Sequence, residues 1–293
     1  MNIQQSDLLT HLNHFLNADR LRLEAQDIEA VLQVVDENVS SMQTFLDALV
    51  NTTLWEHWRI ESNPYLPMIL AVGAEIDRFA SIHTAPAFHS KKHMMEVCLM
   101  LSYLLMHEKA HQQPDSINPV WTSSTSEKWQ LLLAAAAHDL GHPGLINAIP
   151  NELEQRSLDL LRDLMVNSGY APSLLSEVLG ALEPWVLATD HGQYSHLLGR
   201  LELEAPAHVD CLAMLLVESD LLASVLPNRG RELTDRLVQE WAEPYPEKSI
   251  ALRNQLGYLS FLASLRFMSP HSASAGLPRI LNNSLLQLRS PSP

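Results

Sequence analysis

Apolar residues recur at intervals of three and four along almost the whole chain, whereas runs that alternate apolar and polar residues are hard to find. Side chains three and four positions apart share one face of a helix, so this pattern predicts an all-α protein. The expected helices span residues 6–16, 25–35, 40–50, 67–80, 90–107, 127–140, 152–167, 171–189, 208–222, 231–241 and 250–267. The most loop-like interior segment is the polar stretch 111–126, which contains Pro114 and Pro119.

The helices expected in the first fifty residues are short, and helices of that length are marginal in water without a packing partner. We therefore expect residues 1–60 to form an N-terminal helical segment that packs on a larger domain at residues 61–288. The polar stretch at residues 289–293 predicts a disordered tail.

The chain has 293 residues, of which 46% are hydrophobic, and this is enough to bury a large core. Its net charge of −15 argues against a nucleic-acid polymer as partner, because binding to a polyanion depends on Lys and Arg. Cys98 and Cys211 are the only cysteines, so we expect neither a disulfide framework nor a thiolate cluster for zinc. The sequence has no basic leader before an apolar run and no apolar stretch of about 20 residues, so we expect a cytoplasmic protein that does not enter a membrane.

The segment at residues 138–144, with the sequence HDLGHPG, places two imidazoles and a carboxylate at the end of a predicted helix. Neighbouring residues of a helix point about 100° apart, so His138 and Asp139 reach one metal ion only where the helix ends. Pro143 and Gly144 provide that end. His142 follows His138 by four residues and lies on about the same face if the turn continues.

Two further segments carry candidate metal ligands. His89 and His93 are four residues apart and would share a helix face, although a surface helix with incidental histidines is an alternative. Asp220 lies within an apolar helix, where a carboxylate needs a compensating charge from a metal ion or from a nearby arginine. Together the three segments favour a divalent ion that activates hydroxide, and so a metal-dependent hydrolase.

Six segments, in one order over residues 60–268, resemble the catalytic domain of class I 3′,5′-cyclic nucleotide phosphodiesterases, a family within the HD-domain phosphohydrolases. They are FHSKKH at residues 88–93, HDLGHPGLIN at 138–147, VLATD at 186–190, SD at 219–220, TDRL at 234–237 and NQLGY at 254–258. The resemblance implies a compact multi-helix bundle of the HD-domain type, with residues 61–288 as the catalytic domain.

The resemblance also implies a role for each matched residue. A first metal ion, expected to be zinc, would be bound by His93, His138, Asp139 and Asp220. Asp139 would bridge to a second ion, expected to be magnesium or manganese. His142 would hydrogen-bond to metal-bound solvent, Glu154 would contact the bridging solvent, and His89 would be the general acid.

The substrate pocket implied by the resemblance is a glutamine with an aromatic clamp, which maps onto Gln255, Tyr258, Leu237 and Trp241. Tyr258 and Trp241 have a second interpretation, because aromatic residues at helical spacing are often part of the core.

The chain departs from the family pattern close to these segments. Phe88 and Ser90 stand where the family has tyrosine and asparagine, and Gly141 stands where it has a second aspartate. The family has two histidines after the matched Glu154, and an asparagine that lines the purine pocket. The corresponding residues here are Arg156, Ser157 and Ala223.

These observations predict hydrolysis of a phosphodiester by a metal-bridging hydroxide, with a 3′,5′-cyclic nucleotide, cAMP or cGMP, converted to its 5′-monophosphate. Two alternatives stay open: an HD-domain phosphohydrolase that acts on another phosphoester, and a non-catalytic nucleotide-binding module. The expected partner is a small-molecule phosphoester, and the oligomeric state, including a homodimer, stays open.

Overall fold

The computed structural model describes residues 5–17, 23–108 and 119–289, and within these ranges it contains α-helices and short 3-10 turns but no strand. The all-α prediction is therefore confirmed. The helices are α1 (Gln5–Phe15), α2 (Ala25–Asn38), α3 (Met42–Val50), α4 (Thr53–His57), α5 (Tyr65–Ile82), α6 (Lys91–Met106), α7 (Thr125–Ala137), α8 (Glu152–Asn167), α9 (Pro172–Leu187), α10 (Tyr194–Leu201), α11 (His208–Leu222), α12 (Arg229–Glu240), α13 (Pro246–Arg253), α14 (Gln255–Ser264), α15 (Pro270–Ala275) and α16 (Leu277–Arg289).

Most predicted helices are present with their ends shifted by a few residues, but the one expected at 250–267 is wrong. Two helices, α13 and α14, meet there at Asn254, whose side chain caps α14 by accepting a hydrogen bond from the N–H of Gly257 at 2.8 Å. The sequence pattern did not predict α4, α10, α15 or α16. Residues 111–118 of the expected loop and 290–293 of the expected tail lie outside the described residues.

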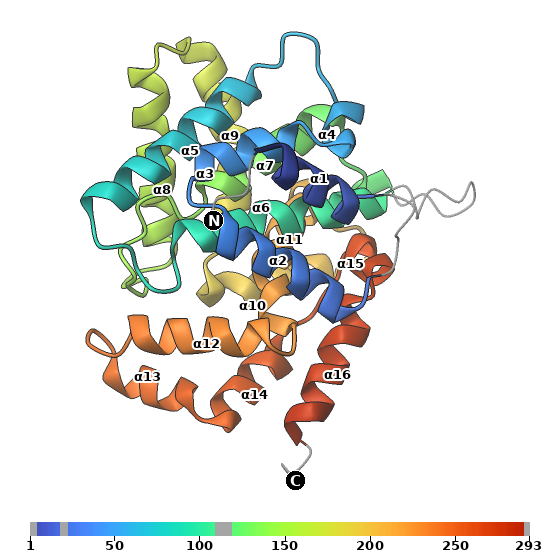
Figure 1. Cartoon of the computed structure of the whole chain (residues 1–293), viewed down its shortest axis with the longest axis vertical. Coiled ribbons are helices and arrows are strands. Elements are labelled where there is room, and N and C mark those ends of the chain that lie inside the picture. Colours follow the sequence, from blue (N-terminus) through green and yellow to red (C-terminus); the bar gives the residue numbers. More distant parts are fainter. Residues whose placement is uncertain (1–4, 18–22, 109–118, 290–293) are drawn as a thin grey trace.

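The centre of the molecule is formed by α6, α7 and α11, which pack on one another (Figure 1). Every residue of α6 from His93 to Met106 is buried, as expected for a helix that has apolar side chains on all faces. In α7 the small residues Ala134–Ala137 are buried, and small side chains let neighbouring helices approach closely. Each of these helices carries part of the site described below.

The remaining helices surround this centre. The N-terminal helices contribute to the same hydrophobic core, because α3 packs on both α5 and α6, and α2 packs on α6. Helices α12, α13 and α14 lie below α6 and α11 in Figure 1. None of the described helices combines the length and the apolar character that crossing a lipid bilayer requires.

A buried arginine joins three of these helices. Arg229, at the start of α12, is 6% exposed; its Nε donates to Glu96 on α6 at 2.7 Å and its Nη1 to Asp36 on α2 at 2.8 Å. The backbone carbonyl of Asp36 also accepts a hydrogen bond from Lys92 at 2.8 Å. Because a desolvated guanidinium is stable only with ionic partners, these contacts fix α12 and α2 beside the first turns of α6.

Candidate functional site

The end of α7 directs two neighbouring side chains into one space. His138 is the C-cap of the helix, and its Nδ1 donates to the backbone carbonyl of Ala135 at 2.9 Å. This bond directs Nε2 of His138 away from the helix and toward the facing carboxylates, and Nε2 is buried without a hydrogen-bond partner among the described residues. The chain then turns through Gly141, whose φ of 70° is a left-handed conformation that favours glycine.

Four donor atoms from three regions of the chain converge beside this turn. Nε2 of His93 lies 3.0 Å from Oδ1 of Asp220 and 3.5 Å from Oδ2 of Asp139. Nε2 of His138 lies 3.3 Å from the same oxygen of Asp139 and 3.8 Å from that of Asp220. Of the four residues that the sequence analysis assigned to the first metal ion, His93, His138 and Asp220 have donor atoms that all lie within 4.8 Å of one another, and Asp139 approaches the two imidazoles from beside them.

The electrostatics of this cluster fit a cation. No lysine or arginine of the described residues forms an ion pair with Asp139 or Asp220, so the arginine that the sequence left open as a partner of Asp220 is not found there. Burial disfavours a charged His138, but the facing carboxylates outweigh burial and raise its pKa to about 9. Two imidazole nitrogens and two carboxylate oxygens are a donor set that suits a divalent metal ion.

His89 is held by a carboxylate from α12. Its Nδ1 donates to Oε1 of Glu240 at 2.5 Å, and Oε2 of Glu240 accepts the backbone N–H groups of Phe88 and His89 at 2.7 and 3.1 Å. Although burial lowers the pKa of His89, the hydrogen bond to Glu240 and the nearby carboxylates leave it raised. His89, His142 and Glu240 also lie close enough to share a metal ion, but the short hydrogen bond accounts for the His89–Glu240 approach without one.

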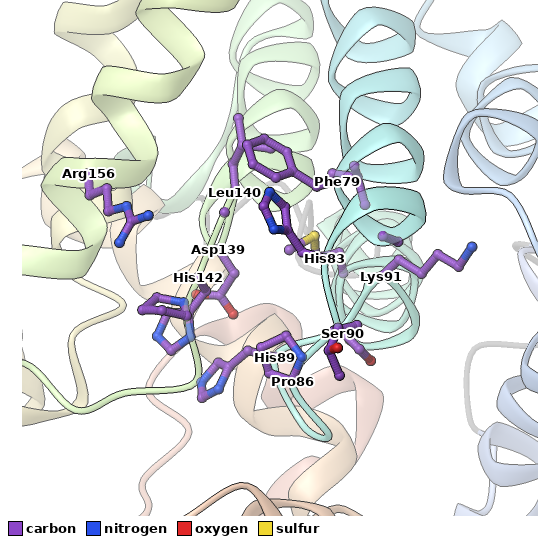
Figure 2. A pocket seen from close by; sticks show the side chains of 17 residues that line it. Phe79, His83, Pro86, His89, Ser90, Lys91, Asp139, Leu140, His142 and Arg156 are labelled. Atoms are coloured by element: carbon purple, nitrogen blue, oxygen red, sulfur yellow. The ribbon is translucent and has the colours of Figure 1, made fainter. Parts of the chain in front are cut away.

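His142 stacks on His89, with ring centroids 3.7 Å apart, and both lie beside Asp139 in Figure 2. Burial and the neighbouring His89 lower the pKa of His142 to about 3, so its ring is neutral near pH 7. Its Nδ1 accepts the N–H of Gly144 at 3.1 Å, which leaves the proton on Nε2.

Glu154 lies near this cluster at the start of α8 and is 8% exposed. Its Oε2 accepts a hydrogen bond from the amide of Asn147 at 2.9 Å, and the carbonyl oxygen of that amide accepts the N–H of Leu153. Burial raises the pKa of Glu154. Asp190 belongs to the segment at residues 186–190, and the sequence analysis gave it no role of its own. Its carboxylate accepts hydrogen bonds from the N–H groups of Asn151 and Gly192 and so fixes the loop before α8.

A cavity of about 600 Å³, here called the substrate pocket, opens onto these side chains. The predicted site residues that line it are His89, His93, His138, Asp139, His142, Glu154, Asp220, Leu237 and Trp241. Phe261 and Leu252 add apolar surface to the same wall. A volume of this size is within the range of pockets that bind small molecules.

Two predicted pocket residues lie elsewhere. Gln255 is exposed at the first turn of α14, and its amide donates to the backbone carbonyl of Leu288 on α16. Tyr258 is buried, with its hydroxyl donating to the carbonyl of Ser224 at 3.0 Å, so it is a core residue. The cause is the break at Asn254, after which α14 directs Phe261 into the pocket.

Glu240 is the main site residue that sequence reasoning missed. It is separated from His89 by 151 positions and lies at the end of a polar helix, so no local motif points to it. Phe261 carried no signal either, because the matched segment ended at residue 258.

The fold has relatives among solved structures. Forty-three chains match, including the Leishmania protein LmjPDEB1 in complex with IBMX, with a TM-score of 0.65 and 17% sequence identity. The match covers 88% of this chain and 90% of that one. At this identity the likeness establishes the fold. A search of curated proteins gave no match.

A family model described as 3′5′-cyclic nucleotide phosphodiesterase matches residues 88–249, which is more than half of the chain. The matched region contains every residue of the histidine and carboxylate cluster as well as Glu240, and it ends before Gln255. This family depends on divalent metal ions, and the donor set described above fits that requirement. The chain therefore belongs to the 3′,5′-cyclic nucleotide phosphodiesterase family and is a hydrolase that acts on a small-molecule substrate.

Proposed function

We propose that the site converts cAMP or cGMP to the 5′-monophosphate, with the first metal ion bound by His93, His138, Asp139 and Asp220. The observation that carries this proposal is the convergence of four donor atoms, without a permanent cation, at one end of a 600 Å³ pocket. Asp139 is the carboxylate shared with a second ion.

The donor types support the expected identity of each ion. Imidazole nitrogens together with carboxylates suit zinc, whereas a second ion that shares only one carboxylate keeps several waters, as magnesium or manganese does. A divalent ion at this site supplies Lewis acidity, because it lowers the pKa of water and neutralises negative charge on phosphoryl oxygens.

His89 is the general acid in this proposal. Because Glu240 accepts the proton on Nδ1, the Nε2–H of a protonated His89 is free to protonate the 3′ oxygen as it leaves. The two backbone bonds from Glu240 fix the position of the segment that carries His89. His142, neutral and stacked on His89, has an Nε2–H that can donate to solvent in the pocket. Glu154 also lines the pocket and can accept a hydrogen bond from solvent, with its carboxylate oriented by the amide of Asn147.

The far end of the pocket would hold the base. Trp241, Leu237 and Phe261 supply apolar and aromatic surface there, and aromatic rings bind nucleobases by stacking. Gln255 and Tyr258 have no part in this proposal, because neither lines the pocket. Discrimination between adenine and guanine would then depend on other polar groups of the pocket.

A substrate panel tests the proposal. The purified full chain, loaded with zinc and with magnesium or manganese, is assayed with cAMP, cGMP, a linear phosphodiester and a phosphomonoester. We expect one of the two cyclic nucleotides to have the highest kcat/KM and the 5′-monophosphate to be the product. A higher kcat/KM for the linear diester or the monoester would overturn the proposed substrate.

A further inference from the structure

A second cavity, here called the rear cavity, has a volume of about 280 Å³ and is shown in Figure 2. It shares only three residues with the substrate pocket: His89, Asp139 and His142. The rest of its lining comes from α5, the start of α6, the turn after Asp139 and α8. The two cavities therefore lie against the same three side chains, and both take residues from α6 and α8, but α5 lines only the rear cavity and α12 only the substrate pocket.

The charge of the rear cavity differs from that of the chain as a whole. Acidic residues outnumber Lys and Arg by 34 to 19 in the sequence, whereas this lining contains Lys91, Arg156 and the single carboxylate Asp139. Asp139 is already part of the metal cluster, and Lys91 pairs with Asp77 at 3.5 Å. The ammonium of Lys91 also donates to the backbone carbonyl of Ser40 and points away from Arg156 in Figure 2, so Arg156 is the cation of the lining that is directed at the cavity.

Arg156 is the cation that has no protein partner there. Acidic residues lie one turn away on either side of it in α8, but Glu152 accepts the N–H of Ala148 and Asp159 pairs with Arg162 at 2.5 Å. Among the described residues, none forms an ion pair or a hydrogen bond with the guanidinium of Arg156. Its side chain extends from α8 toward the turn that carries Asp139 and His142 (Figure 2).

Two departures from the family pattern meet in this cavity. Gly141 stands where the family has an aspartate, and Arg156 where it has a histidine. A side chain at residue 141 would be strained in this turn, because φ is 70°, and the end of the Leu160 side chain would have to move away from an added Cβ, which would lie 2.5 Å from its Cδ1. The chain thus lacks an acid and has a permanent cation at the same place.

We propose that the rear cavity binds a phosphate dianion, with Arg156 as its main ligand and His83 beside it. A guanidinium binds two phosphate oxygens at once, and a tetrahedral anion has further oxygens for donors that approach from other directions. Arg156 and His83 are exposed, whereas Met94 and Leu140 supply buried apolar surface at the inner end of the cavity. Neither Arg156 nor His83 is one of the proposed metal ligands.

Equilibrium dialysis of the metal-loaded full chain with labelled orthophosphate tests the proposal. Orthophosphate also binds at catalytic metal ions, so the comparison is between Arg156→Gln and Arg162→Gln, a matched loss of charge on α8 outside the rear cavity. We expect Arg162→Gln to bind as the wild type does. In Arg156→Gln one class of site should weaken roughly tenfold or more, the effect of losing a charge-assisted bidentate contact.

Two further arms complete the test. The variant Asp220→Ala lacks one of the proposed metal ligands, and we expect it to keep the phosphate-binding site that depends on Arg156. Loss of metal and loss of this phosphate site can therefore be measured separately. Dialysis with a nucleoside 5′-monophosphate in place of orthophosphate tells whether the phosphate is free or is that of the product. Equal binding by Arg156→Gln and the wild type would overturn the proposal, as would an equal loss in Arg162→Gln.

Discussion

The end of the site that carries the proposed metal ligands and the proposed substrate wall lie on different kinds of helix. His93 and Asp220 belong to α6 and α11, which are buried on nearly all sides, and His138 ends the buried α7. Leu237 belongs to α12 and Trp241 is its C-cap, and this helix has one exposed face and packs on α13 at the periphery. Positions on central helices are fixed by many neighbours, whereas those on peripheral helices depend on a few contacts and on where each helix ends.

The largest effect is expected from Asp220→Ala. Removing one of four donors should abolish bound metal and lower kcat/KM at least ~1000-fold, or about 4 kcal/mol of transition-state stabilisation. Elemental analysis and a cyclic-nucleotide assay measure the two quantities. Asp210→Ala is the matched control, because Asp210 lies on the same helix and pairs with Arg200 away from the pocket. Full turnover by Asp220→Ala would remove the metal cluster from the mechanism.

A smaller loss, with the metal retained, is expected from His89→Asn. A general acid contributes about 100-fold or more to kcat, and His89 is not among the four donors. The metal content of the variant should equal that of the wild type, and His196→Asn, at an exposed position of α10, should leave kcat unchanged. If His89→Asn also lost its metal, the assignment of His89 as a general acid that is not a metal ligand would be wrong.

Glu240→Gln tests whether α12 acts on the chemistry through His89. Without the carboxylate the pKa of His89 should fall, because the bond to Glu240 raises it. A general acid works in its protonated form, below its pKa, so the alkaline fall in kcat should move to lower pH. We expect kcat near pH 7 to drop roughly tenfold, as for other residues that orient a catalytic histidine. Glu243→Gln is the control, and an unchanged pH profile would contradict this role.

The smallest effect is expected from a pair of variants that tests which residues form the substrate wall, Trp241 as the structure places it or Gln255 as the sequence resemblance implied. Trp241→Ala should raise KM about tenfold, or about 1.4 kcal/mol, through the loss of stacking surface, with kcat little changed. Gln255→Ala should leave KM within about twofold, because its amide bonds to Leu288 instead of lining the pocket. Steady-state kinetics with the preferred cyclic nucleotide measures both. A larger effect for Gln255→Ala would mean that α14 moves when substrate binds.

The sequence was sufficient to predict the fold class, most helix positions and four side chains that lie close together in the structure, while their binding of a metal ion stays a prediction. Helical spacing and the motif at residues 138–144 are local signals, and a helix end at Ala137 is enough to orient His138 and Asp139. The position of Gln255 and the contact between Glu240 and His89 depend on how distant helices pack. No local pattern reports such packing, so the substrate wall could be predicted only by analogy, and two of its four residues lie elsewhere.

The buried contacts of Arg229 have a consequence for the integrity of the chain. Helices α1 to α3 share one core with the rest of the molecule, and Asp36 joins them to both α6 and α12. Ser62, in the turn before α5, has a left-handed backbone with φ of 56° and is an exposed site for a protease. A cut there would yield two fragments that stay associated. Their separation would expose the apolar surface that they share, and it would remove Asp36 from the buried ion pairs that Arg229 forms with Asp36 and Glu96.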